Sequence, residues 1–337
     1  MPKEKESPKV SVIIPAYNSA SSLEYSVKSA LVQDYSNIEI IIVNDGSTDE
    51  TPIIAQGIAH KNKTVKVVNQ ENRGLGEARN SGTASATGDY IIFLDSDDML
   101  LPWSISEMID VAEKGKADII IGKMLETSRP AEEYNRLTGE ARVNSAARKL
   151  PDGFEDLLYM KVLPSAHAKL YRSALVKNER FSRIRHAEDL EYNLRIFKKT
   201  KKIYVLDSPV VEIYAFTSGS MMRSAYNDKK HEELQILHDL VKKCDGSKKE
   251  TRRKAYAASI FFHSIGLIRM LYNDKEATEK YAGDYKQLKR YIKKYSHSVL
   301  FDKKALASQR KYALVAAVSV AAMLKMMDAA EKKATTR

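Results

Sequence analysis

The chain has 337 residues, 43% of them hydrophobic, so it is long enough to bury one large core with an appendage or the cores of two domains. Its single cysteine, Cys244, excludes an internal disulfide framework and is typical of a reducing compartment. The formal net charge of +11 is concentrated late in the chain, where residues 221–337 hold 26 Lys and Arg against 13 Asp and Glu. The basic side chains of such a region either attract polyanions and anionic membranes or only keep the surfaces of helices solvated.

The first hundred residues alternate between expected strands and expected helices. Apolar, β-branched runs predict strands at Val10–Ile14, Ile38–Val43, Val65–Val68 and Asp89–Leu94, and helical patterns lie between them. The near-continuous apolar run of the second strand indicates a sheet that is covered on both faces. This alternation predicts an α/β fold with a mostly parallel sheet, in which ligands bind at the carboxyl ends of the strands.

The next part of the chain predicts three more short strands, at Ala117–Gly122, Ala168–Tyr171 and Ile203–Leu206, and a helix at Ala187–Lys199. Residues 123–152 are polar and weakly patterned, so a variable loop or lid is expected there. From residue 228 onward every segment has a helical pattern. Helices are expected at Asp228–Lys243, Lys248–Tyr272, Glu276–Tyr295 and Lys303–Lys333. This change of pattern predicts a domain boundary near residue 220.

Neither end of the chain has the pattern of a membrane segment. Met1–Lys9 is polar and charged, and the apolar stretch Ala313–Leu324 has only twelve residues. A spanning helix needs about 20 apolar residues. We therefore expect a cytoplasmic protein.

A buried strand pattern ends in three carboxylates, those of Asp95, Asp97 and Asp98. Asp95 and Asp97 lie two residues apart, so an extended backbone points both side chains to the same side. Hard oxygen ligands at the end of a strand suit Mg²⁺ or Mn²⁺ that carries a substrate diphosphate. The alternative is a solvated polar loop.

Two other segments follow strands in a way that suits a nucleotide. Asp45 precedes a Gly-Ser-Thr turn. It either closes this turn or accepts a hydrogen bond from the imide N–H of a base such as uracil. Tyr17 could stack on that base. The segment from Asn72 to Arg79 contains two glycines and begins a helix, which favours a phosphate near its N-terminus. Arg79 could fork onto diphosphate or base oxygens; the alternative is a helix start with surface arginines.

Later segments offer candidates for chemistry. Glu188 and Asp189 open a helix, where carboxylates are favoured by the helix dipole or serve as a general base. Lys169 could reach a phosphate, and His167 could pack beneath an acceptor pocket. Residues 218–223 could fold over a diphosphate or form only a linker.

Taken together, the segments Val10–Asn18, Val43–Asp49, Asn72–Gly82, Thr87–Asp98, Ala168–Arg172 and Glu188-Asp189 resemble family 2 inverting glycosyltransferases of the A-type fold over roughly residues 8–220. The resemblance implies a nucleotide-sugar donor, usually UDP-linked, and Mn²⁺ or Mg²⁺. It implies that Asp97 binds the metal and that Asp189 is the catalytic base. Glu188 and His167 would lie on the acceptor side. The residues implied or suggested as donor contacts are Pro15, Ala16, Tyr17, Asp45, Asn72, Arg79, Asp95, Ser96, Lys169, Ser220 and Arg223.

Two positions depart from the family pattern: Asn44 stands where an aspartate is frequent, and His167 where an aromatic residue is frequent. With the resemblance, residues 1–220 are expected to form a catalytic domain whose donor half is about 1–100 and acceptor half about 101–220. Residues 221–337 would form a basic helical domain. Its layout is distantly similar to bacterial glycosyltransferases that decorate wall teichoic acid, in which a helical tail mediates self-association.

With the resemblance, the sequence predicts a metal-dependent, inverting transfer of a hexose or N-acetylhexosamine from a UDP-sugar to a bacterial surface glycan such as teichoic acid, capsule or a lipid-linked polysaccharide. The basic tail would bind an anionic or lipid-linked acceptor, touch the inner face of the membrane or form a homo-oligomer. A nucleic-acid partner is not expected, since no recognition motif is found. The alternatives are a metal-dependent nucleotidyltransferase and a non-catalytic module that binds nucleotide-sugars.

Overall fold

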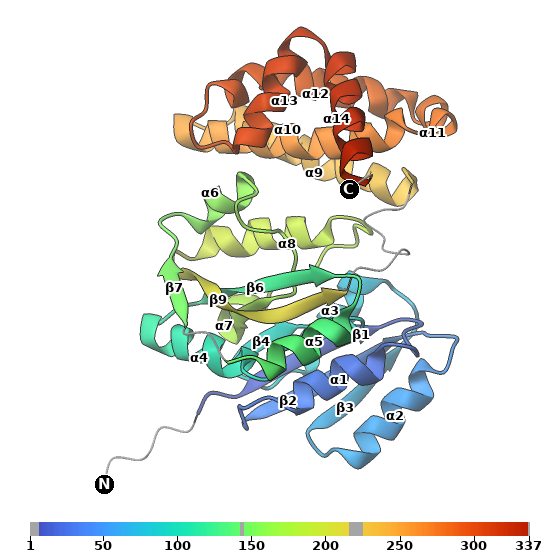
Figure 1. The fold of residues 1–337 in the computed structure, drawn as a ribbon, viewed down its shortest axis with the longest axis vertical. Helices are drawn as coiled ribbons and strands as arrows, with labels where there is room; N and C mark the ends of the chain where they lie inside the picture. Colours follow the sequence, from blue (N-terminus) through green and yellow to red (C-terminus); the bar gives the residue numbers. More distant parts are fainter. Residues whose placement is uncertain (1–6, 142–144, 216–224, 336–337) are drawn as a thin grey trace. The chain divides into compact units, whose positions relative to one another are not determined.

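The computed structural model describes residues 7–141, 145–215 and 225–335 and contains two compact units (Figure 1). The sheet unit comprises Met1–Gly153, Pro164–Arg183 and Glu188–Ser220. The helical unit comprises Phe154–Leu163, Ile184–Ala187 and Met221–Arg337. Two short segments that precede the predicted boundary near residue 220 thus belong to the helical unit.

The sheet unit is built on a single mixed sheet with the strand order β3-β2-β1-β4-β8-β6-β9-β5, and β7 pairs with β9. Its strands are β1 (Val10–Ala16), β2 (Ile38–Asp45), β3 (Val65–Gln70), β4 (Tyr90–Phe93), β5 (Met99–Leu100), β6 (Ile119–Thr127), β7 (Ala146–Lys149), β8 (Lys169–Arg172) and β9 (Ile203–Ala215). The four strands at one end, β3, β2, β1 and β4, are all parallel. β8 is antiparallel to both β4 and β6. The predicted α/β fold with a mostly parallel sheet is confirmed.

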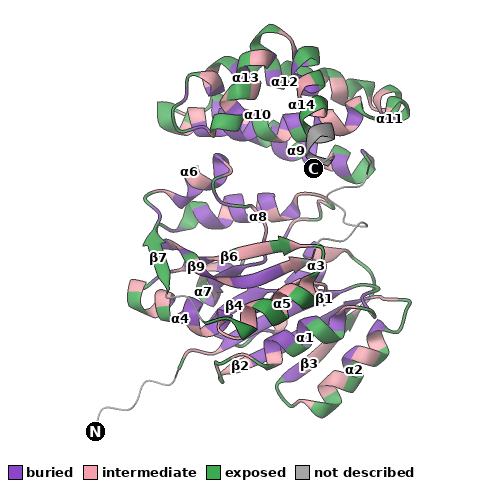
Figure 2. Ribbon diagram, in the orientation of Figure 1, coloured by how far each residue is buried: buried purple, intermediate pink, exposed green. Residues whose placement is uncertain are grey.

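Helices cover both faces of this sheet (Figure 1). They are α1 (Leu23–Leu31), α2 (Thr51–Lys61), α3 (Leu75–Ser85), α4 (Ser104–Gly115), α5 (Pro130–Gly139), α7 (Ser173–Val176) and α8 (Glu188–Ile196), followed by the 3₁₀ helix η1 (Phe197–Lys199). One face of the central strands forms a core with α1 and α4, to which Ile14, Val27 and Met108 belong. α3 packs closely on the other face. A Cβ on Gly82 of α3 would lie 2.3 Å from the Ile13 side chain, so this close approach needs glycine. The central strands are therefore buried on both sides, as Figure 2 shows.

Two local predictions were wrong. The loop expected at residues 123–152 contains the end of β6, α5 and β7, because polar residues of β6 pair with β9 in parallel register. The first strand, expected to end at Ile14, continues through Pro15 to Ala16. β4 ends its pairing with β1 at Phe93, so Pro15 lies beyond that neighbour and its missing N–H leaves no gap in the ladder.

The helical unit is all-helical in the part that the structure describes. It contains most of α6 (Gly153–Leu158) together with α9 (Asp228–Asp245), α10 (Glu250–Tyr272), α11 (Lys275–Lys280), α12 (Ala282–Leu300), α13 (Ala307–Val318) and α14 (Val320–Thr335). α10 is long and apolar enough to cross a membrane, but 67% of its most apolar window is buried in the protein. Its apolar side chains therefore serve as the core of a folded unit.

The last two predicted helices are each interrupted. The first divides into α11 and α12 at Tyr281, and the second divides into α13 and α14 at Ser319, whose backbone is extended and whose Oγ accepts a hydrogen bond from the Ala322 N–H. The break divides the apolar stretch Ala313–Leu324 between two helices. Leu324 is fully buried, whereas Val318 is 89% exposed.

Candidate active site

Loops that follow β1, β2 and β4 meet at the carboxyl edge of the sheet. Ser19 Oγ lies 2.7 Å from Ser96 Oγ, and the Asn18 N–H donates to Ser47 Oγ at 3.0 Å. Pro15 and Ala16 end β1 as buried residues, whereas Tyr17 is 50% exposed. The structure thus brings the predicted β1, β2 and β4 candidates to one edge of the parallel strands.

Asp45, the last residue of β2, holds the turn that leads into α3. Its Oδ1 accepts hydrogen bonds from Gln70 Nε2 at 2.6 Å and from the Arg73 N–H at 2.9 Å, while its Oδ2 accepts from the Gly74 N–H at 2.8 Å. Asn72 is exposed on this turn. A Cβ on Gly46 would lie 2.5 Å from the Asn72 nitrogen, so the two turns approach each other closely. Asp45 therefore shapes the loop, and any contact with a base would use its remaining acceptor capacity.

Arg79 of α3 binds three carboxylates and is only 1% exposed. Its Nη2 donates to Asp95 Oδ1 at 2.8 Å and its Nη1 to Asp189 Oδ1 at 2.5 Å, while Glu188 Oε1 lies 3.6 Å from Nη1. The other oxygen of Asp189 accepts a hydrogen bond from the Ala166 N–H at 2.8 Å. The guanidinium was expected to face the donor, and here it binds carboxylates of its own chain.

The charges of this cluster influence one another strongly. Although burial disfavours a charged guanidinium, Asp189 and Asp95 raise the pKa of Arg79. Burial also opposes the ionised form of Asp95, but the Arg79 cation outweighs it and keeps the pKa of Asp95 below its usual value. Burial and the neighbouring Asp189 raise the pKa of Glu188 to about 7. Asp95 is therefore held as an anion, whereas Glu188 takes up a proton readily near neutral pH.

Lys169 and His167 lie in or beside β8 and are both buried. Lys169 Nζ donates to the Ser165 carbonyl oxygen at 2.6 Å, and burial lowers the pKa of Lys169 to about 8. His167 Nδ1 lies 2.5 Å from Glu212 Oε1. Burial disfavours the imidazolium, but the Glu212 carboxylate raises the pKa of His167. Both predicted site residues thus have protein partners.

A group of potential metal ligands lies beside this cluster. Ligand atoms of Asp95, Asp98 and His167 all lie within 4.8 Å of one another. Carboxylate oxygens and an imidazole nitrogen suit Mn²⁺ or Mg²⁺. Asp97, the predicted ligand, is partly buried next to them, and burial and the charge of Asp95 raise its pKa. A divalent cation would relieve that repulsion, so the residues present fit such an ion.

Sequence reasoning missed Glu212 and Ala166 as site residues, and it placed Asp98 in the carboxylate cluster without giving it a role. Glu212 has a recognisable signal, because it is an acidic residue inside the apolar run of β9 and is fully buried. Ala166 contributes only its backbone N–H, for which no sequence pattern exists. Ser220 and Arg223 lie outside the described residues.

Comparison with known proteins identifies the family. The model of glycosyl transferase family 2 matches residues 11–178. EpsJ of Bacillus subtilis (strain 168), an uncharacterized glycosyltransferase, is 31% identical over 234 residues, which cover 68% of this chain and 67% of EpsJ. EpsH of the same strain, likewise named a glycosyltransferase, is 30% identical over 271 residues, which cover 77% of this chain and 76% of EpsH.

Solved structures agree at the level of the fold. S. aureus TarS 1–349 in complex with UDP-GlcNAc has a TM-score of 0.68 at 20% identity and covers 97% of this chain and 92% of its own. The mannosyltransferase PcManGT from Pyrobaculum calidifontis, in complex with GDP-Man and Mn²⁺, has a TM-score of 0.55 at 18% identity, with 92% and 86% covered. The fold, the family model and the two Bacillus relatives together show that the chain belongs to glycosyl transferase family 2 and is a glycosyltransferase.

Proposed function

We propose that this glycosyltransferase transfers a sugar from a UDP-sugar to an acceptor hydroxyl in one displacement that inverts the anomeric carbon. The observation that carries the proposal is the Asp189 carboxylate. It is 20% exposed and held by Arg79 and the Ala166 N–H beside Asp95. Structural neighbours in complex with UDP-GlcNAc and with UDP support a uridine donor. Family membership favours glycosyl transfer over the alternative of nucleotidyl transfer.

In this mechanism Asp189 accepts the proton of the acceptor hydroxyl while that oxygen attacks the anomeric carbon. The bond between the anomeric carbon and the diphosphate oxygen breaks, and UDP leaves from the opposite face. A carboxylate whose orientation is fixed at both oxygens loses little entropy when the acceptor binds. Asp189 is therefore proposed as the general base, with Glu188 beside it on the acceptor side.

The donor would lie along the carboxyl edge of β1, β2 and β4. Tyr17 is exposed enough to stack on the base, and Asp45 keeps acceptor capacity for an imide N–H. The remaining proposed donor contacts are Pro15, Ala16, Asn72, Arg79, Asp95, Ser96, Lys169, Ser220 and Arg223.

A divalent ion is proposed at Asp97, with Asp95, Asp98 and His167 as neighbouring donors. When bound, it would stabilise negative charge on the leaving diphosphate. The protein's own contribution is to keep Asp95 ionised through Arg79 and to place Asp98 and His167 within reach of it.

We expect UDP to bind this protein far more tightly with Mn²⁺ than without it, and Asp97→Ala to weaken that binding at least about tenfold, because a carboxylate ligand of the ion is lost. Calorimetric titration with a panel of nucleotides and nucleotide-sugars measures this. Asp110→Ala, which removes an exposed carboxylate of α4, is the matched control. Absence of uridine-selective binding would reject the proposed donor, and identical affinities with and without metal would reject the ion.

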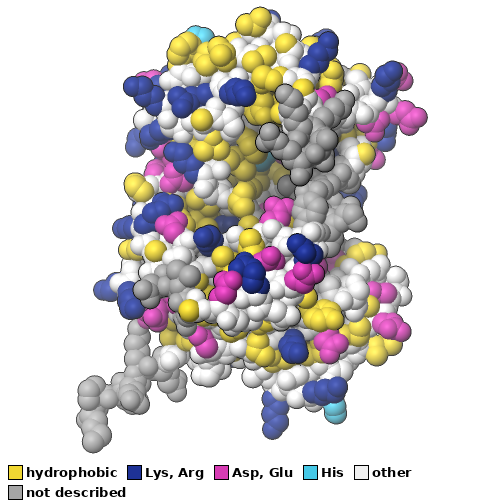
Figure 3. Space-filling model, viewed as in Figure 1, with side chains coloured by type: hydrophobic (Ala, Val, Ile, Leu, Met, Phe, Trp, Pro, Cys, Tyr) yellow, Lys and Arg dark blue, Asp and Glu magenta, His cyan; other side chains and the backbone are white. Residues whose placement is uncertain are grey.

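The acceptor is proposed to be an anionic bacterial surface glycan such as a teichoic acid. α12 supports this, because Lys286, Lys289, Arg290 and Lys293 are exposed and follow helical spacing along one face. Lys and Arg side chains are also spread over the face of the helical unit that is visible in Figure 3. Cytoplasmic location, self-association through α13 and α14, peripheral membrane contact and the division at residue 220 stay predictions.

With a teichoic acid polymer as the probe, we expect binding to weaken steeply between about 50 and 300 mM NaCl while the affinity for UDP changes little. The exposed cations of α12 are screened by salt, whereas Asp95 and Asp97 of the proposed donor site are partly buried and are screened less. Lys286→Glu combined with Lys289→Glu should abolish polymer binding. Lys61→Glu combined with Lys63→Glu, which changes exposed lysines of the sheet unit, is the control. Equal effects of the two double variants on polymer binding would reject α12 as the acceptor surface.

A further inference from the structure

Two short segments of the helical unit lead directly to the proposed general base. Phe154–Leu163 ends three residues before Ala166, whose N–H donates to Asp189. Ile184–Ala187 is followed at once by Glu188 and Asp189. Asp189 and its backbone donor Ala166 thus belong to the sheet unit, but each follows closely in the chain after a segment of the helical unit.

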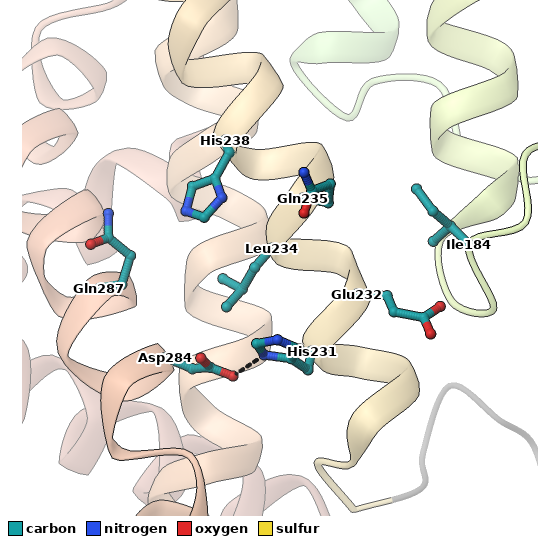
Figure 4. A pocket seen from close by; sticks show the side chains of 8 residues that line it. All are labelled: Ile184, His231, Glu232, Leu234, Gln235, His238, Asp284 and Gln287. Carbon is teal, nitrogen blue, oxygen red and sulfur yellow. Dashed lines mark hydrogen bonds and ion pairs between the residues drawn. The ribbon is translucent and has the colours of Figure 1, made fainter.

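The second segment is held by two adjacent carboxylates of α9. Glu232 accepts hydrogen bonds from the Arg185 N–H at 2.8 Å and from the guanidinium, with Nε and Nη2 at 2.8 and 2.5 Å. Figure 4 shows Glu232 on α9 with its carboxylate turned toward the segment that carries Ile184. Glu232 and Ile184 both line a groove of about 390 Å³ in the helical unit.

Glu233 forms a buried three-membered cluster with two histidines. His186 Nδ1 lies 3.0 Å from Glu233 Oε2, and His263 Nδ1 of α10 lies 3.0 Å from Oε1. Although burial opposes the charged carboxylate, the two imidazoles hold the pKa of Glu233 at about 2. Charge-assisted bonds of this kind are worth roughly twice a neutral hydrogen bond, so His186 is firmly fixed to α9 and α10.

The first segment is held by α13 and the turn that precedes it. Tyr159 donates its hydroxyl to Asp302 Oδ2 at 2.6 Å, and its carbonyl oxygen accepts from Gln309 Nε2 at 3.4 Å. Lys304 Nζ lies 2.9 Å from Glu155 Oε2. Each segment therefore has its own set of polar anchors in the helical unit.

We infer that the helical unit positions the general base through these two segments, with Glu233 and His186 as positioning residues for Asp189. The inference rests on the proposed role of Asp189. Consecutive Cα atoms are 3.8 Å apart, so the three residues from His186 to Asp189 span at most about 11 Å. Ala187 between them has a φ of +60°, which is unfavourable for alanine and persists only where its neighbours are fixed. Loss of the anchor would release Asp189 from its place beside Arg79.

Glu233→Ala is expected to lower kcat for release of UDP from a UDP-sugar at least about tenfold, while the donor KM and the calorimetric affinity for UDP stay within about twofold. Glu233→Gln, which keeps the shape and one acceptor, should restore most of the rate. Hydrogen exchange followed by mass spectrometry should show faster exchange in peptides that cover residues 164–168 and 187–192. These readouts separate positioning from a general loss of stability.

Asp284→Ala is the matched control, because Asp284 also pairs with two residues of the helical unit, the buried Tyr226 at 2.8 Å and the exposed His231 at 2.6 Å, and neither partner belongs to the two segments. It should leave kcat and exchange at residues 187–192 unchanged. Wild-type kcat and exchange in Glu233→Ala would overturn the inference. If Asp189→Asn is inactive while Glu233→Ala is fully active, only this inference fails; if Asp189→Asn is as active as wild type, the proposed function fails first.

Discussion

Replacing Asp189 by asparagine is expected to lower the rate of sugar transfer by about 10²–10⁴-fold, the usual contribution of a general base. The side chain keeps its size but loses the charge that accepts the acceptor proton. It also loses one of its two favourable contacts, because an amide cannot accept from both Arg79 Nη1 and the Ala166 N–H. UDP release from a UDP-sugar measures the rate, and calorimetry with UDP checks that the donor site is intact.

Glu191→Gln is the matched control for this experiment. Glu191 lies on the same helix, α8, and pairs with Arg195 at 2.7 Å rather than with Arg79. We expect the rate of this variant to stay within about twofold of wild type, since exposed or half-exposed ion pairs on a helix contribute only a few tenths of a kcal/mol. A fully active Asp189→Asn enzyme would remove Asp189 as the base and restore the interpretation of a non-catalytic binding module.

Arg79→Met is expected to lower the free energy of unfolding by about 3–5 kcal/mol, because it leaves Asp95, Asp189 and Glu188 in a buried site without their cation. The rate of transfer should fall with it, since Asp189 loses one of its two anchors. Urea unfolding measures the stability, and UDP affinity is measured in the same samples. Arg79→Lys keeps the charge but cannot fork between two carboxylates. Its stability and rate should therefore lie between those of wild type and those of Arg79→Met.

This experiment separates two roles for Arg79. If the guanidinium holds the carboxylates, stability and rate fall while UDP affinity changes little. If it binds the donor, as the family resemblance implies, UDP affinity falls most and stability is nearly unchanged. Arg73→Met is the control, because Arg73 lies on the turn before α3 and carries an exposed side chain whose guanidinium is 4.0 Å from Glu71.

The sequence by itself determined the parallel half of the sheet and the edge at which the site lies. Continuous apolar runs such as Ile38–Val43 are typical of strands that are covered on both faces, and a helix between two such strands is the usual crossover of a parallel pair. Asp45 is the last residue of β2 and Asp95 lies two residues after the end of β4, so their place at the carboxyl edge needs no information beyond local pattern.

Only the tertiary structure decided which groups the site residues bind. Arg79 meets carboxylates 16 and 110 residues away, and a charged side chain carries no signal of its partner along the chain. The same holds for β6, whose polar half is a strand only because β9 lies beside it. Residues 184–187 look like part of the catalytic domain in sequence, yet the carboxylates of α9 bind them to the helical unit. Local pattern encodes burial and secondary structure, whereas ion pairs and strand neighbours are set by contacts that form only when distant segments meet.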